Sequence, residues 1–176
     1  MPQRITLIVF LCGMMSFAQS ASLWLDVPFF KQEKDGCGAA VIAMVTEYWR
    51  QKQSNSMPPA DLAGIQRALL SKEAHGIYAS DLKRYFEEHG FSAFALNGTL
   101  DDFRHHLDKG RPLIVALKPM AGQTSLHYVV VVGLDPGESI VLVNDPAQKK
   151  LLKMDRRQFE KEWNAVQHWT LLALPK

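Results

Sequence analysis

The pattern of apolar and polar positions divides the chain into a first half that predicts helices and a second half that predicts strands. In the first half, apolar residues recur at helical spacing between loops rich in proline, glycine and serine. In the second half, the apolar stretches are short, rich in β-branched residues and bounded by Gly, Pro or Asp. This order favours an α+β fold, in which an N-terminal helical lobe packs on an antiparallel sheet.

Helices are expected over 37–51, 61–70, 80–89 and 100–109, and from Asp155 through Trp163. The first of these is apolar on nearly every face, so we expect it to be buried. Ser80, Thr99 and Asp155 are placed to cap the third, fourth and fifth helices, and Gly90 and Gly110 to end the third and fourth.

Strands are expected over 91–96, 113–117, 128–132, 140–143, 151–154 and 170–174, and an extended lead-in over 21–28. If the third and fourth of these strands form a hairpin, His127 before the first and Asp145 after the second lie at the same end of it. The Asp135–Pro136 pair then lies at the opposite end, where it forms a turn.

The first 21 residues differ in kind from the rest and predict a secretory signal peptide. Arg4 gives a basic start, an apolar run covers 5–15, and small residues follow over 16–21. We therefore expect an exported protein, periplasmic or extracellular, that meets the membrane only through this segment. The alternative is an uncleaved anchor helix, although the apolar run is short beside the roughly 20 residues of a full span.

The remaining residues, 22–176, are enough for one domain with its own core. The formal charge is only +2, and no run of Lys and Arg is interleaved with aromatic residues. This composition argues against a nucleic-acid partner. The histidines show no metal-ligand spacing with Cys, Asp or Glu, so neither a metal nor an organic cofactor is expected.

Removal of the signal peptide leaves Cys37 as the lone cysteine, since Cys12 departs with it. Exported proteins usually pair their thiols or lack them, so a single thiol is a candidate reactive group. Cys37 lies at the start of the first helix, where free amides and the helix dipole stabilise a thiolate and an oxyanion. Gly36 and Gly38 leave room for a substrate. The alternative interpretation is a buried structural cysteine.

His127 and Asp145 are the candidate partners of this thiol. A histidine at a strand end beside a polar loop can project into a cleft and accept the thiol proton. At the same end of the hairpin, Asp145 can orient the imidazole as the third member of a triad. The alternatives are a histidine that is merely hydrogen-bonded structure and an Asp–Pro turn.

Three motifs stand in order along the chain: Gln-x-x-x-x-Cys-Gly-x-x-x-x-x-Met from Gln32, His-Tyr-Val-Val-Val from His127, and Asn-Asp-Pro around Asp145. Together they resemble the bacteriocin-processing, double-glycine-leader peptidases, a papain-like family of cysteine peptidases. The resemblance implies a papain-like fold with Cys37 as nucleophile, His127 as general base and acid, and Asp145 as the orienting carboxylate. It also implies that the Gln32 side chain donates to the oxyanion beside the Cys37 amide.

By this resemblance we expect a peptidase that hydrolyses a peptide bond through an acyl-thioester, in a leader or secreted peptide. Its partners would be that peptide or protein substrate and an export or secretion system. Exporters of the family continue into membrane spans and an ATPase, whereas this chain ends at Lys176, so we expect a stand-alone secreted member. Whether a Gly-Gly site is required is not specified by the sequence. Two alternatives are an acyl transferase or amidase with the same triad, and a non-catalytic peptide-binding module.

Overall fold

The computed structural model describes residues 23–54, 57–119, 126–135, 137 and 139–176, and the expected signal peptide lies outside them. The helices are α1 (Cys37–Lys52), α2 (Leu62–Leu69), α3 (Ala79–Glu88), α4 (Leu100–Asp108) and α5 (Arg156–Asn164). The strands are β1 (Leu23–Trp24), β2 (Phe91–Asn97), β3 (Leu113–Leu117), β4 (His127–Asp135), β5 (Ile140–Asn144), β6 (Leu152–Asp155) and β7 (Trp169–Pro175). Over the described ranges, none of these helices is both long and apolar enough to cross a membrane.

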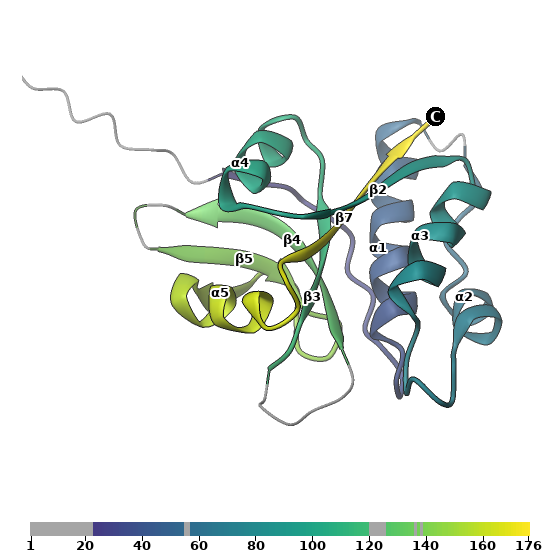
Figure 1. Cartoon of the computed structure of the whole chain (residues 1–176). Coiled ribbons are helices and arrows are strands. Elements are labelled where there is room, and N and C mark those ends of the chain that lie inside the picture. Colours follow the sequence, from purple (N-terminus) through teal and green to yellow (C-terminus); the bar gives the residue numbers. More distant parts are fainter. Residues whose placement is uncertain (1–22, 55–56, 120–125, 136, 138) are drawn as a thin grey trace, which may run out of the picture.

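The described strands form one antiparallel sheet in the order β2-β7-β3-β4-β5-β6, with β1 paired to β4. Helices α1, α2 and α3 lie together on one side, and α4 and α5 lie on the other (Figure 1). This arrangement confirms the predicted α+β class. Helices α4 and α5 form a second helical layer, on the other side of the sheet from the expected N-terminal lobe (Figure 1).

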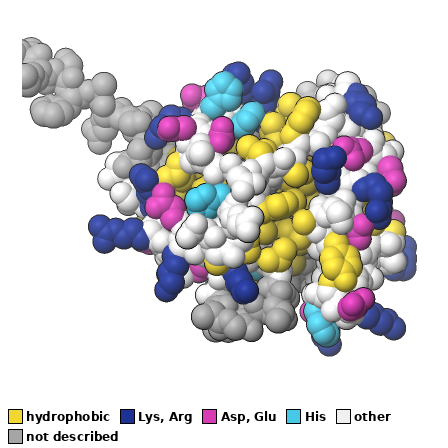
Figure 2. Space-filling model, in the orientation of Figure 1, with side chains coloured by type: hydrophobic (Ala, Val, Ile, Leu, Met, Phe, Trp, Pro, Cys, Tyr) yellow, Lys and Arg dark blue, Asp and Glu magenta, His cyan; other side chains and the backbone are white. Residues whose placement is uncertain are grey.

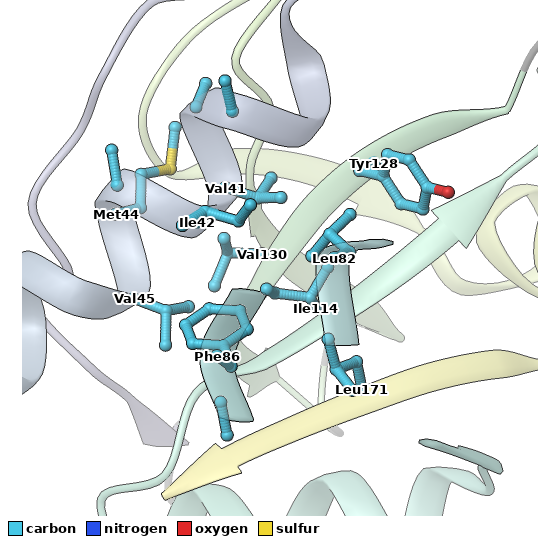
Figure 3. Close-up of a cluster of buried hydrophobic side chains, with 14 of the residues drawn as sticks. Val41, Ile42, Met44, Val45, Leu82, Phe86, Ile114, Tyr128, Val130 and Leu171 are labelled. Carbon is cyan, nitrogen blue, oxygen red and sulfur yellow. The ribbon is translucent and has the colours of Figure 1, made fainter. Parts of the chain in front are cut away.

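Two buried cores lie on the two faces of the sheet. Figure 3 shows the first core, where α1 and α3 meet β3, β4 and β7; its labelled residues include Ile42, Phe86, Ile114, Val130 and Leu171. Strand β4 supplies both cores, because Tyr128 and Val130 belong to the first and Val129 and Val131 to the second. Burial on both faces explains why β4 is continuously apolar rather than alternating.

Apolar side chains also reach the surface where the two helical groups meet. Figure 2 shows them gathered in a band over the middle of this face, where β2 and β7 cross the view. Phe94 of β2 is 53% exposed, the largest exposed fraction among the large apolar side chains described. Phe94 is exposed because β2 lies at the edge of the sheet.

Most predicted helix ends are confirmed. Thr99 forms a capping box with Asp102, and Asp155 caps α5 by accepting from the amides of Arg157 and Gln158. Gly110 follows α4 with φ of 67°, in the left-handed region that suits glycine. The predicted cap at Ser80 is wrong.

The N-cap of helix α3 is the extended Tyr78, two residues before the predicted cap at Ser80. The Tyr78 carbonyl already accepts from the Leu82 amide at 3.0 Å. No side chain caps this helix, so its start is set by the backbone turn that follows the Ser71–Gly76 bridge. Ser80 lies inside the first turn of the helix.

The lead-in was predicted to be extended over 21–28, but a strand forms only at Leu23–Trp24 and residues 21 and 22 lie outside the described ranges. Beyond the strand, single hydrogen bonds hold the segment to the β4–β5 hairpin. The Leu25 amide donates to the Val132 carbonyl at 2.7 Å, and the Asn144 side chain donates to the Val27 carbonyl at 3.1 Å. The hairpin therefore guides the chain to the start of α1.

Gly133 of β4 is needed for the close approach of β1. A Cβ atom at this position would lie 2.6 Å from the Leu23 carbonyl oxygen and 2.8 Å from the Trp24 Cβ. We expect Gly133→Ala to lower the free energy of unfolding by about 1–3 kcal/mol in urea denaturation. Gly137→Ala is the control, because its nearest such neighbour is an Asp135 side-chain oxygen at 3.5 Å. Equal effects of the two substitutions would contradict this explanation.

Candidate active site

Cys37 is the first residue of α1 and is only 7% exposed. Its thiol donates a long hydrogen bond to the Leu126 carbonyl, with an Sγ···O distance of 3.9 Å. No side chain caps the helix, and its first turn holds no acidic residue. The amides of this turn are thus free to face negative charge at the sulfur or on a bound substrate.

The two glycines beside Cys37 have packing roles that the sequence did not reveal. A Cβ on Gly38 would lie 2.9 Å from the Cβ of Ile77, and one on Gly36 would lie 2.7 Å from the Gln66 Oε1. Gly38 thus lets α1 pack against the 71–78 segment. The space that it leaves is filled by Ile77 and is not open to a substrate.

The β4–β5 hairpin brings His127 and Asp145 together. His127 opens β4, Asp145 follows β5, and the antiparallel register pairs Val130 with Asn144. The His127 Nε2 lies 2.8 Å from the Asp145 Oδ1. Because Nε2 is engaged by the carboxylate, the other ring nitrogen remains for the Cys37 thiol. The predicted hairpin is confirmed.

The charges of this pair follow from their surroundings. Burial alone lowers the pKa of His127, but the hydrogen bond to Asp145 and the adjoining Cys37 side chain outweigh it and raise the pKa to about 9. Burial raises the pKa of Asp145, whereas the hydrogen bond with His127 and those from Ala147 and Gln148 hold it below its ordinary value. At neutral pH the pair is therefore an imidazolium and a carboxylate.

Asp145 is only 3% exposed and needs further donors, which come from the turn that follows it. The Ala147 amide donates to Oδ1 at 2.9 Å, and the Gln148 side chain donates to Oδ2 at 2.6 Å. Gln148 was missed by sequence reasoning. The one available signal was an amide side chain three residues after Asp145, in a turn that returns to it.

Asn144 is a second residue that sequence reasoning did not single out. It is fully buried, donates to the Val27 carbonyl, and accepts from the Leu151 amide at 3.0 Å. These bonds fasten the lead-in and the β5–β6 turn to the residue that precedes Asp145. Asn144 thus fixes the backbone from which the carboxylate projects.

Gln32 lies beside this turn, since its amide donates to the Pro146 carbonyl at 3.0 Å. Its side-chain oxygen is buried and has no hydrogen-bond partner in the described part of the chain. A half turn of the carboxamide would exchange this oxygen for its NH₂ group. An unpaired buried carboxamide is expected where a ligand completes the hydrogen bonding.

All four residues singled out from the sequence line one hollow of about 380 Å³: Gln32, Cys37, His127 and Asp145. His75, from the loop before α3, also lines it. A larger hollow of about 690 Å³ lies between α4, α5 and the far end of the β4–β5 hairpin, and none of the four lines it. Chemistry rather than size identifies the candidate site. Among the described residues, no group of three or more His, Cys, Asp or Glu is placed to hold a metal ion.

Comparison with known proteins gives a family and a fold. The model of the Peptidase_C39 like family matches residues 24–170 of the chain. No curated protein matches it significantly.

Several solved structures are similar. A Bacillus anthracis protein assigned as a C39-like peptidase has 17% identity and a TM-score of 0.66, with 89% of this chain and 99% of that one covered. The peptidase domain of Streptococcus ComA, a bifunctional ABC transporter of a quorum-sensing pathway, has 22% identity and a TM-score of 0.66 over 84% and 98%. A double-glycine-motif protease from an AMS/PCAT transporter, in complex with the leader peptide, has 19% identity and a TM-score of 0.61 over 89% and 100%. At these identities the likeness is one of fold.

The pairing of His127 with Asp145 can be measured by following the imidazole nitrogens of His127 by NMR as pH is varied. We expect a midpoint near pH 9 in the wild type and a clearly lower midpoint in Asp145→Asn, because the hydrogen bond and the charge of Asp145 raise the pKa of His127. Because the folded value lies above the unfolded one, this interaction stabilises the fold fully below about pH 6.5 and is lost as pH rises through about 9. A wild-type midpoint at or below 6.5 would contradict the pairing.

Proposed function

Because this chain belongs to the Peptidase_C39 like family, we propose that it hydrolyses a peptide bond through an acyl-thioester formed on Cys37. By family and fold the chain is a papain-like cysteine peptidase. The observation that carries the proposed mechanism is the 2.8 Å contact between His127 and Asp145 in the hollow that also holds Cys37.

In the first step, the Cys37 thiol gives its proton to the free ring nitrogen of His127. The resulting thiolate attacks the carbonyl carbon of the peptide bond, and the carbonyl electron pair moves to the oxygen. The imidazolium of His127 then gives its proton to the leaving amine as the C–N bond breaks. Asp145 holds the ring and balances its charge while it is protonated. The raised pKa of His127 supports this role, because the proton that the amine needs is already on the ring.

In the second step, neutral His127 takes a proton from water as the water oxygen attacks the thioester carbon. The C–S bond breaks, the product leaves as an acid, and the thiolate and imidazolium are restored. In both steps the carbonyl oxygen carries negative charge in the transition state.

That oxyanion needs donors beside the sulfur, and we assign this role to the Cys37 amide and the Gln32 carboxamide. Two observations support the assignment. The first turn of α1 has no side-chain cap, and the Gln32 side chain lines the same hollow with an unpaired group. The hydrogen bond from the Gln32 amide to Pro146 ties this donor to the turn that carries Asp145.

We further propose that the substrate is a leader or secreted peptide and that the protein acts after export, in the periplasm or outside the cell. The structurally similar double-glycine-motif protease in complex with the leader peptide supports a peptide substrate. The basic start, apolar run and small residues of positions 1–21 support export.

The mechanism can be tested with the full chain, a mixture of synthetic peptides and water enriched in ¹⁸O. We expect Cys37→Ala to reduce cleavage by at least about a thousandfold, because the nucleophile is lost. Cys12→Ala is the matched control and should retain full activity. Mass spectrometry of the wild-type products should find ¹⁸O in the new carboxyl group. Cleavage that persists in Cys37→Ala, or acyl groups found on amines without ¹⁸O, would contradict the proposal.

A further inference from the structure

Glu162 is a charged residue in the cleft that the mechanism above does not use. It belongs to α5, is only 7% exposed, and lines the same hollow as Cys37 and His127. Glutamate is almost never this deeply buried unless its charge is paired, because desolvation of a carboxylate is costly. A partner for the charge of the Glu162 carboxylate is therefore expected.

Within the described residues, Glu162 has a hydrogen bond but no ion pair. The Gln158 Nε2, one helical turn earlier, donates to the Glu162 Oε1. A carboxamide is neutral and leaves the charge uncompensated. No described residue forms a hydrogen bond with the other carboxylate oxygen, Oε2. This oxygen is not fully enclosed by protein atoms. The Oε2 is thus free to bond to a molecule in the hollow.

The backbone places Glu162 one strand away from the candidate base. Its carbonyl accepts from the Lys118 amide at 3.2 Å, and Leu117, just before Lys118, is the register partner of His127. Helix α5 packs on the face of the sheet opposite to α1. Glu162 therefore reaches the hollow from the helical layer of α5, whereas Cys37 reaches it from α1 on the other face of the sheet.

The described lining of the hollow is acidic although the chain is mildly basic, with a formal charge of +2. Its described lining includes Asp35, Asp145 and Glu162, and neither lysine nor arginine. Asp145 is balanced by His127. Among the residues that the structure describes, no lysine, arginine or histidine pairs with the carboxylates of Asp35 and Glu162.

We propose that Glu162 is a specificity residue that binds a positively charged nitrogen of the substrate. In a peptide this nitrogen belongs to a lysine or arginine side chain or to the α-ammonium group. A cation that donates to Oε2 would supply the missing charge in a site already shielded from water, where such a hydrogen bond is strong. The inference rests on the proposed function, because it assigns a substrate class to the same cleft.

The direct test measures how fast Cys37 reacts with small thiol reagents of different charge. The aminoethyl, methyl and sulfonatoethyl methanethiosulfonates carry positive, zero and negative charge, and mass spectrometry of the Cys37 peptide separates this reaction from that of Cys12. We expect the wild type to react at least about tenfold faster with the cationic than with the anionic reagent, and this ratio to shrink in 1 M salt. A ratio near one in the wild type would overturn the proposal without any variant.

Glu162→Gln removes the charge, keeps the shape, and can still accept from Gln158. We expect it to lower the cationic-to-anionic ratio at least about fivefold and to leave the rate with the neutral reagent unchanged. The matched control is Glu160→Gln, on the same helix. Glu160 pairs with Arg156 at 3.2 Å and lines the larger hollow, so this control should keep the wild-type ratio. Equal ratios for the two variants would overturn the proposal.

Peptides then identify the source of the charge. A synthetic mixture is offered in four forms, with lysines free or acetylated and with N-termini free or acetylated. We expect cleavage to fall at least about tenfold when the recognised amine is acetylated, and Glu162→Gln to remove that difference. Lysine acetylation alone would identify a side chain, and N-terminal acetylation alone the α-ammonium group. Equal cleavage of all four forms would overturn the proposal.

Different results contradict the mechanism at Cys37 and the specificity role of Glu162. If Cys37→Ala abolishes hydrolysis while Glu162→Gln leaves charge selectivity intact, the peptidase mechanism holds and the specificity inference is wrong. If hydrolysis persists in Cys37→Ala, the mechanism is wrong, and the reagent ratios still decide whether Glu162 makes the cleft select cations.

Discussion

The antiparallel pairing of β4 with β5 is the constraint on which the site depends. It returns the chain to the end from which it started, so that His127 and Asp145, 18 residues apart in sequence, meet at 2.8 Å. The same hairpin holds the lead-in through Val132 and Asn144, and the turn after it holds Gln32 through Pro146. Helix α1 packs on one face of β4 and presents Cys37 at this end. One two-stranded unit thus positions every member of the candidate site.

The energetics of the site rest on how burial is balanced. Asp145 is as buried as a core residue, yet it accepts from His127, the Ala147 amide and Gln148, and these donors keep it ionised. The ionised carboxylate in turn keeps a proton on His127, against the effect of burial. Glu162 shows the opposite case in the same hollow, since the only partner of its carboxylate among the described residues is the neutral Gln158 side chain. Burial of a carboxylate is costly unless its charge is paired, and this contrast is the basis for assigning Asp145 to the resting site and proposing Glu162 as a ligand-binding residue.

Much of this could be predicted from local sequence. The lone thiol at a helix start, the capping residues Thr99 and Asp155, and the hairpin that joins His127 to Asp145 all follow from short-range rules. Contacts between segments far apart in the sequence could not be predicted from these short-range rules. Gly38 was interpreted as room for a substrate because its neighbour, Ile77, lies 39 positions away, and Glu162 reaches the cleft only because α5 packs beside the end of β3. Spacing along a chain cannot reveal which segments a sheet order brings together.

The most direct test of the central claim is the rate at which iodoacetamide alkylates Cys37 at pH 6, in the wild type and in His127→Asn. If the hairpin couples His127 to the thiol, the imidazolium stabilises the thiolate, and the substitution should slow alkylation about tenfold or more. The Cys37 peptide is followed by mass spectrometry, with free cysteine in the same mixture as the reference thiol. Equal rates in the two proteins would mean that His127 and Asp145 form a structural pair with no influence on Cys37, and the claim would be wrong.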